Sequence, residues 1–137
     1  MINIKEQALL FVNAIIKTQK NNEFTDRMKY FPRGCCDDTC DLFAYYLFNE
    51  FGIKTVQLNG FIESEDTYHN WLVIEDDMII DLTIKQFNYF NNYEDMFYFG
   101  YSNEFYLNID RIKQVNHCDI TAHKNLNLDY NLILKNM

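Results

Sequence analysis

Cys36 stands where an apolar segment begins, in the sequence Phe31-Pro32-Arg33-Gly34-Cys35-Cys36-Asp37-Asp38. If that segment is a helix, Cys36 lies in its first turn, where backbone N–H groups have no intrahelical partner and the helix dipole is positive. Both effects favour the thiolate, which is the nucleophilic form of cysteine. The same N–H groups can stabilise a developing oxyanion. Asp37 and Asp38 oppose a second anion, so the balance depends on whether they point away from the sulfur.

A proton carrier for this thiol is available in His69, and Asp81 can orient it. His69 lies in an expected strand and Asp81 in the next one, and residues at even separation along a strand share a face. The two side chains therefore meet only if the loop between the strands has an odd number of residues. A three-residue loop at 75–77 pairs Trp71 with Asp81 and leaves His69 diagonally beside Asp81. A two-residue turn would place Asp81 on the opposite face.

Such a trio predicts acyl chemistry. Cys36 would attack an acyl carbon, His69 would take and return the proton, and Asp81 would accept a hydrogen bond from the far ring nitrogen. Trp71 shares the strand face of His69, so it can line a substrate cleft, donate its N–H to an oxyanion, or simply pack. The neighbouring Cys35 leaves the choice of nucleophile open between the two adjacent cysteines.

The elements that must position these residues follow from apolar periodicity and turn signals. Helices are expected at 4–19, from about 38 to 51 with Gly52 as the stop signal, at 103–115 and from 129 onward. A loop is expected at 21–33, and strands at 53–62, 68–74, 78–83 and 96–101. Helices followed by a meandering antiparallel sheet predict the α+β class. The length predicts one domain spanning residues 1–137.

The motifs resemble the transglutaminase-like branch of the papain-like superfamily of cysteine peptidases. More narrowly, they resemble a group of small uncharacterised bacterial proteins with the pattern Phe-Pro-x-Gly-x-Cys-x-Asp, then His-x-Trp-Leu, then Ile-Asp-x-Thr-x-x-Gln-Phe. Here the pattern falls on residues 31–38, 69–72 and 80–87. The resemblance implies a nucleophile helix packed on a small antiparallel sheet, with Cys36, His69 and Asp81 as the catalytic trio. Family members usually have small residues around the nucleophile, whereas this chain has Cys35 and Cys40.

The composition limits the classes of partner and compartment. Twenty acidic and twelve basic residues give a net charge of −8, so we expect no nucleic acid partner. No apolar run approaches the roughly 20 residues of a membrane span, and the N-terminal segment lacks the uninterrupted apolar centre of a signal peptide. Three of the four cysteines lie within six residues, unlike a secreted disulfide scaffold. We therefore expect free thiols, no membrane association and a cytoplasmic location.

Cofactor binding is not indicated by the sequence. Cys36, Cys40, His69 and Asp81 include zinc-ligand types, but two cysteines four apart on a helix are not a usual zinc motif, so we expect no metal. There is also no glycine-rich loop for a nucleotide or coenzyme A. His117, Cys118 and His123 lie in a weakly patterned region and are expected to be solvated loop residues.

Two functional classes remain. The first is a cysteine hydrolase (peptidase or amidase) or an acyltransferase, acting on a peptide, amide or thioester substrate through an acyl-cysteine intermediate. The second is a non-catalytic binding or regulatory module that keeps the same fold and serves a protein partner. An inert Cys36 would indicate the second class, and a selectively reactive Cys36 the first.

Overall fold

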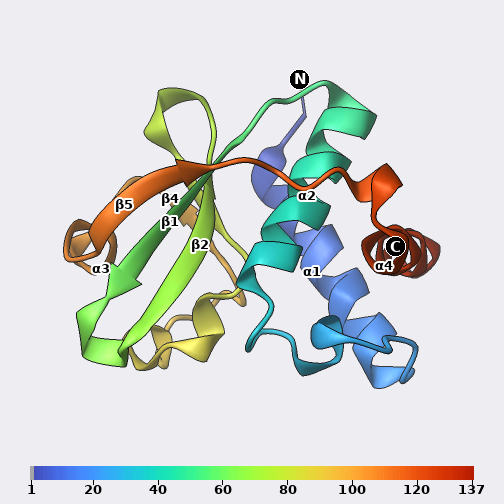
Figure 1. The fold of residues 1–137 in the computed structure, drawn as a ribbon, viewed down its shortest axis with the longest axis horizontal. Coiled ribbons are helices and arrows are strands. Elements are labelled where there is room, and N and C mark those ends of the chain that lie inside the picture. Colours follow the sequence, from blue (N-terminus) through green and yellow to red (C-terminus); the bar gives the residue numbers. More distant parts are fainter. Residues whose placement is uncertain (1) are drawn as a thin grey trace.

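The computed structural model describes residues 2–137, which form a layer of helices against a five-stranded antiparallel sheet (Figure 1). The helices are α1 (Ile4–Lys20), α2 (Cys36–Phe51), α3 (Glu104–Leu107) and α4 (Lys124–Lys135). The strands are β1 (Val56–Ile62), β2 (Thr67–Val73), β3 (Ile79–Asp81), β4 (Tyr98–Gly100) and β5 (Asp110–Val115). Their order across the sheet is β4-β3-β2-β1-β5, and all the paired neighbours are antiparallel. The fold is of the α+β class.

The two long N-terminal helices begin and end at residues with clear physical roles. The side chain of Asn3 accepts a hydrogen bond from the N–H of Glu6 and caps α1, because the first N–H groups of a helix lack intrahelical partners. Helix α2 ends where Gly52 adopts a left-handed conformation with φ of 68°, which glycine tolerates without strain. Helix α2 packs against β2, and α4 contacts both α1 and α2.

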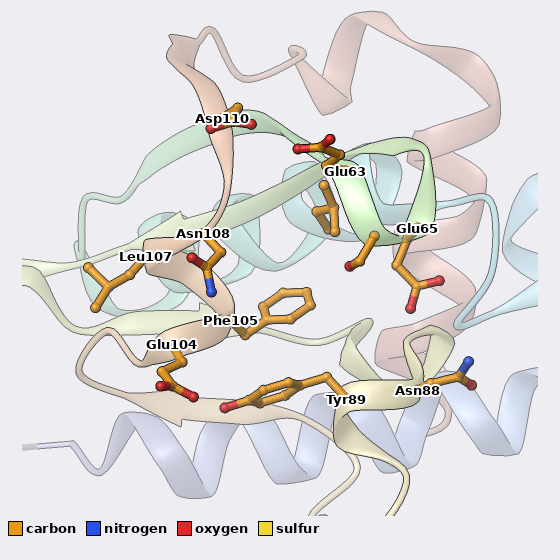
Figure 2. Close-up of a pocket in the computed structure, with 11 residues that line it drawn as sticks. Glu63, Glu65, Asn88, Tyr89, Glu104, Phe105, Leu107, Asn108 and Asp110 are labelled. Atoms are coloured by element: carbon orange, nitrogen blue, oxygen red, sulfur yellow. The ribbon is translucent and has the colours of Figure 1, made fainter.

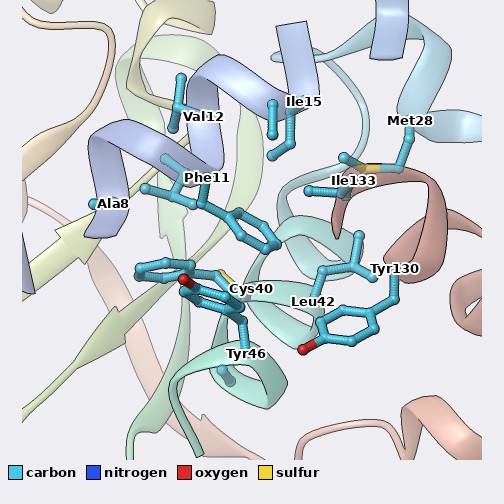
Figure 3. Close-up of a cluster of buried hydrophobic side chains, with 14 of the residues drawn as sticks. Ala8, Phe11, Val12, Ile15, Met28, Cys40, Leu42, Tyr46, Tyr130 and Ile133 are labelled. Atoms are coloured by element: carbon cyan, nitrogen blue, oxygen red, sulfur yellow. The ribbon is translucent and has the colours of Figure 1, made fainter. Parts of the chain in front are cut away.

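The main core lies between the helices and one face of the sheet. Phe11 of α1 packs on Phe43 of α2 with ring centroids 5.1 Å apart, and α4 adds Tyr130 and Ile133 to the same cluster (Figure 3). Leu72 of β2 belongs to this cluster as well. Burial on two sides, against helices and against the sheet, therefore explains the apolar residues of α2 apart from Phe48, which is exposed.

A second apolar cluster, hereafter the aromatic cluster, contains the residues of β2 and β3 on the opposite face of the sheet from the main core. Trp71 and Ile79 belong to it, whereas their strand neighbours Leu72 and Ile80 belong to the main core. The chain after β3 supplies the other members, which are Ile84, Phe87, Phe90, Phe105, Tyr106 and Ile109, together with Ile62 of β1. Most of the aromatic residues after β3 therefore stabilise the fold by packing.

The predicted helix at 103–115 is wrong. Only Glu104–Leu107 is helical, and Asp110–Val115 forms the edge strand β5, which pairs with β1. Five of the six residues of β5 are exposed, so burial of one face does not impose an alternating apolar pattern on this strand. The pairing of β5 with a strand some fifty residues earlier is a tertiary effect that local periodicity does not contain.

No helix within residues 2–137 is both long enough and apolar enough to cross a membrane.

Candidate functional site

The first turn of α2 exposes one cysteine and buries the other. Helix α2 begins at Cys36, two residues before the predicted start, and Cys36 is partly exposed. Cys35 precedes the helix and is fully buried, with the Thr39 hydroxyl 3.6 Å from its sulfur. Burial raises the pKa of the Cys35 thiol to about 12. Of the two adjacent cysteines, Cys36 is therefore the one that a reagent or substrate can reach.

Arg27 offsets part of the charge of the acidic pair that follows Cys36. Its guanidinium donates to Asp37 over 3.2 Å and to Asp38 over 2.7 Å. Both carboxylates are thus held by a cation that the loop before α2 supplies. The negative charge that opposes a thiolate at this helix terminus is reduced accordingly.

The β2–β3 hairpin has the register that the sequence predicts. Val73 lies opposite Ile79, and the connection at 75–77 is a three-residue turn closed by backbone pairing on either side. This register places His69 and Asp81 together, with 2.6 Å between His69 Nε2 and Asp81 Oδ2. The geometric expectation for this pair is confirmed.

His69 is completely buried and is held in its charged form. Burial alone lowers the pKa of His69, but the charge of Asp81 and the hydrogen bond to it raise that pKa, and Cys36 adds to the increase. The result is a pKa of about 9 for His69. At neutral pH His69 is therefore an imidazolium.

The second ring nitrogen of His69 has no partner among the described residues. Nδ1 is buried and makes no hydrogen bond within residues 2–137. Cys36 lies near the ring, since its thiol contributes to the raised pKa of His69. The structure therefore joins His69 to Asp81 by a hydrogen bond, with Cys36 close to the imidazole.

Two further residues hold Asp81. Its Oδ1 accepts from the backbone N–H of Thr83 at 3.2 Å and lies 3.4 Å from the Thr83 hydroxyl. Its Oδ2 accepts from the hydroxyl of Tyr106 at 2.8 Å, in addition to the contact with His69. Sequence reasoning missed Tyr106, which lies in the segment wrongly expected to be one helix and is one of ten tyrosines.

Aromatic rings enclose the imidazole. Trp71 lies 5.9 Å from His69 between ring centroids, with the planes nearly parallel at 20°. Phe87 meets the same ring edge-on at 4.8 Å. Trp71 is only 2% exposed, so it offers almost no surface to a substrate. Its packing against His69 fixes the imidazole ring.

The remaining cysteines and histidines take part in packing and hydrogen bonding outside the His69–Asp81 pair. All four cysteines are free, and burial raises the pKa of Cys40 well above its usual value. His117 and His123 are exposed loop residues, as expected. The ring of His117 lies 3.1 Å from the side chains of Thr55 and Gln57, and that of His123 caps α4 by accepting the N–H of Leu126. In the described part of the chain, no group of three or more His, Cys, Asp or Glu residues is arranged to hold a metal ion.

A cavity of about 860 Å³ is lined by Phe105 and Ile62 of the aromatic cluster and does not include Cys36, His69 or Asp81 in its lining (Figure 2). Figure 2 shows the rings of Tyr89 and Phe105 between carboxylates of neighbouring loops. Phe105 packs on Phe87 at 5.4 Å, and Phe87 in turn contacts His69. Two successive aromatic rings, Phe105 and Phe87, therefore connect the wall of this cavity to the imidazole.

No family model, no curated protein and no solved structure matches this chain. The resemblance to the transglutaminase-like proteins therefore rests on the sequence motifs alone.

Proposed function

We propose that the chain is a cysteine hydrolase or acyltransferase with a papain-like core, working through an acyl-Cys36 intermediate. The observation that carries the proposal is the buried His69–Asp81 pair, 2.6 Å apart, beside an accessible cysteine at the start of α2. A buried histidine with a strongly perturbed pKa next to a specific carboxylate is typical of a functional site.

The proposed reaction follows from the charged state of His69 at neutral pH. The Cys36 thiolate forms a bond to the acyl carbon of an amide, and the carbonyl oxygen becomes an oxyanion near the free N–H groups of α2. His69 donates its Nδ1 proton to the leaving amine as the carbon–nitrogen bond breaks. The product is a thioester on Cys36 with a neutral His69.

The second half of the reaction returns the enzyme to its starting state. Neutral His69 removes a proton from an incoming water or amine, which attacks the thioester carbon and releases the Cys36 thiolate. Water gives hydrolysis, and an amine gives acyl transfer. Throughout, Asp81 accepts from Nε2, which keeps the ring orientation and stabilises the imidazolium.

A non-catalytic binding or regulatory module with a protein partner is the second candidate. The observation that favours it is the complete burial of His69, since a general acid must reach the leaving group of a substrate. Under this alternative Cys36 would react like the other partly exposed cysteine, Cys118.

The test is the pH dependence of alkylation by iodoacetamide, with modified sites read by mass spectrometry. We expect Cys36 to be modified in preference to Cys118, to remain reactive at pH 6, and to slow at least tenfold in His69→Ala. Cys118 is the internal control and keeps its rate in the variant. Equal rates at Cys36 and Cys118, unchanged by His69→Ala, would remove the basis for the enzyme.

A second measurement separates the two chemical outcomes. An activated ester should give an acyl adduct on Cys36, seen as a mass increase that is lost in Cys36→Ser. Faster loss of the adduct in the presence of a primary amine, with the amide as product, indicates acyl transfer. Loss at a rate independent of the amine indicates hydrolysis.

A further inference from the structure

Tyr106 contacts Asp81 from α3, which is separate from both the β2–β3 hairpin and α2. It lies in α3, is 3% exposed, and donates its hydroxyl to Asp81 Oδ2 at 2.8 Å. The cap residue Asn103 fixes the position of α3 by accepting the N–H groups of Phe105 and Tyr106. The side chain is therefore held at its backbone, at its ring and at its hydroxyl.

The hydroxyl of Tyr106 can only act as a donor to this carboxylate. Burial raises the pKa of Tyr106 well above its usual value, and the neighbouring charge of Asp81 raises it further, so the hydroxyl stays protonated. Asp81 then faces donors at both oxygens, from Thr83 on Oδ1 and from His69 and Tyr106 on Oδ2.

The hydroxyl of Tyr106 and Nε2 of His69 share a single oxygen atom. Each donor that a carboxylate oxygen accepts takes part of its negative charge, so the tyrosine weakens the hold of Asp81 on the imidazolium proton. It also fixes the carboxylate plane, and with it the direction in which the ring presents Nδ1. Both effects concern how readily His69 releases a proton.

We propose that Tyr106 is a positioning residue that fixes Asp81 and lowers the proton affinity of His69, so that the imidazolium can act as an acid toward the leaving group. This inference rests on the proposed function for its catalytic meaning, but its effect on His69 is measurable without turnover. In the reaction drawn above, a His69 that held its proton too tightly would slow release of the amine. Tyr106 acts through Asp81 and contacts no reacting atom.

The test is Tyr106→Phe, which removes only the hydroxyl and keeps the ring contact with Trp71 at 5.7 Å. The titration of His69 is followed by nuclear magnetic resonance of the imidazole C–H groups in the full chain. We expect the pKa of His69 to rise by about half a unit or more, because Asp81 Oδ2 then accepts from His69 alone.

Tyr98→Phe is the matched control. Tyr98 lies in the same cluster, with its ring 5.4 Å from that of Tyr106, but its hydroxyl donates to the backbone of Tyr101. It should leave the titration of His69 unchanged. If Tyr106→Phe does not fold, Asn103→Ala releases the cap of α3 while keeping the hydroxyl, and a smaller upward shift is expected because Tyr106 then holds Asp81 less firmly.

The outcomes separate this inference from the proposed function. A folded Tyr106→Phe with an unchanged titration of His69 overturns the positioning role, whatever Cys36 does. An upward shift in a protein whose Cys36 is inert overturns the enzyme and leaves the coupling between Tyr106 and His69 in place. A shift in Tyr98→Phe equal to that in Tyr106→Phe attributes the effect to general loosening and also overturns the inference.

Discussion

Arg27 controls the negative charge that Cys36 faces at the start of α2, because its guanidinium holds both Asp37 and Asp38. In Arg27→Gln the two carboxylates are unpaired, and the thiolate becomes less favourable. We expect Cys36 to be alkylated about threefold more slowly at low ionic strength, as one charge a few ångströms away in water-like surroundings predicts. The deficit should shrink in high salt, since exposed charges are screened.

Lys29→Gln is the control for Arg27→Gln, because Lys29 is an exposed cation from the same turn that contacts the ring of Tyr30. It should not alter the rate at Cys36. The free energy of unfolding should change by less than about 1 kcal/mol in either variant, as for other exposed ion pairs. An unchanged rate in Arg27→Gln at low salt would show that the two aspartates do not affect the sulfur.

At the scale of elements, the junction of β1 and β5 depends on the missing side chain of Gly60. A Cβ at this position would lie 2.3 Å from Cγ2 of Ile109 and 3.2 Å from the carbonyl oxygen of Asp110. Because Ile109 is itself buried, it has little room to move. We expect Gly60→Ala to lower the free energy of unfolding by about 1–3 kcal/mol, the usual range for overpacking.

The double variant Gly60→Ala with Ile109→Ala identifies the cause of that loss. Truncating Ile109 removes Cγ2, so the combined loss in a urea titration should be smaller than the sum of the two single losses. Additive losses would place the effect in the backbone of β1 instead. Gly34→Ala creates no such clash, since a Cβ there meets nothing within 4 Å. Any loss of stability in that variant comes from the strain of its positive φ.

The sequence predicted those parts of the site that depend on local pattern. Strand alternation and the length of the turn at 75–77 were enough to place His69 beside Asp81. The predicted start of α2 was two residues late, because Asp37 and Asp38 are both suited to precede a helix. Tyr106 could not be found, since its contact with Asp81 depends on how the chain after β3 folds back over the sheet.

At the scale of the whole molecule, the C-terminal helix α4 places an acid inside an already acidic protein. Asp129 is 3% exposed and lies on the buried face of α4 with Leu126, Tyr130 and Ile133. The sequence predicted a helix from residue 129, whereas α4 begins at Lys124 and so presents Asp129 inward. Helical pattern alone does not reveal which polar residue is buried when the first turn of a helix has been missed.

Burial raises the pKa of Asp129 to about 6, and the charges of Asp38 and Asp26 add to the effect while His123 opposes it. The native state therefore binds this proton more tightly than the unfolded state, whose value is near 3.8. The stabilisation is fully present below that lower value and is lost as the pH rises through about 6. At neutral pH an ionised Asp129 thus destabilises the docking of α4.

Asp129→Asn should remove this penalty without changing the shape of the side chain. We expect the variant to exceed the parent protein in free energy of unfolding by up to about 3 kcal/mol at pH 7.5, as a difference of about two pKa units predicts. The advantage should decline at pH 5 and vanish near pH 4, where Asp129 is protonated in the parent protein. Urea titrations at the three pH values measure it, with Glu94→Gln as an exposed control expected to show no such trend. A gain that stayed constant with pH would mean that the carboxylate charge of Asp129 does not oppose the packing of α4 on α2.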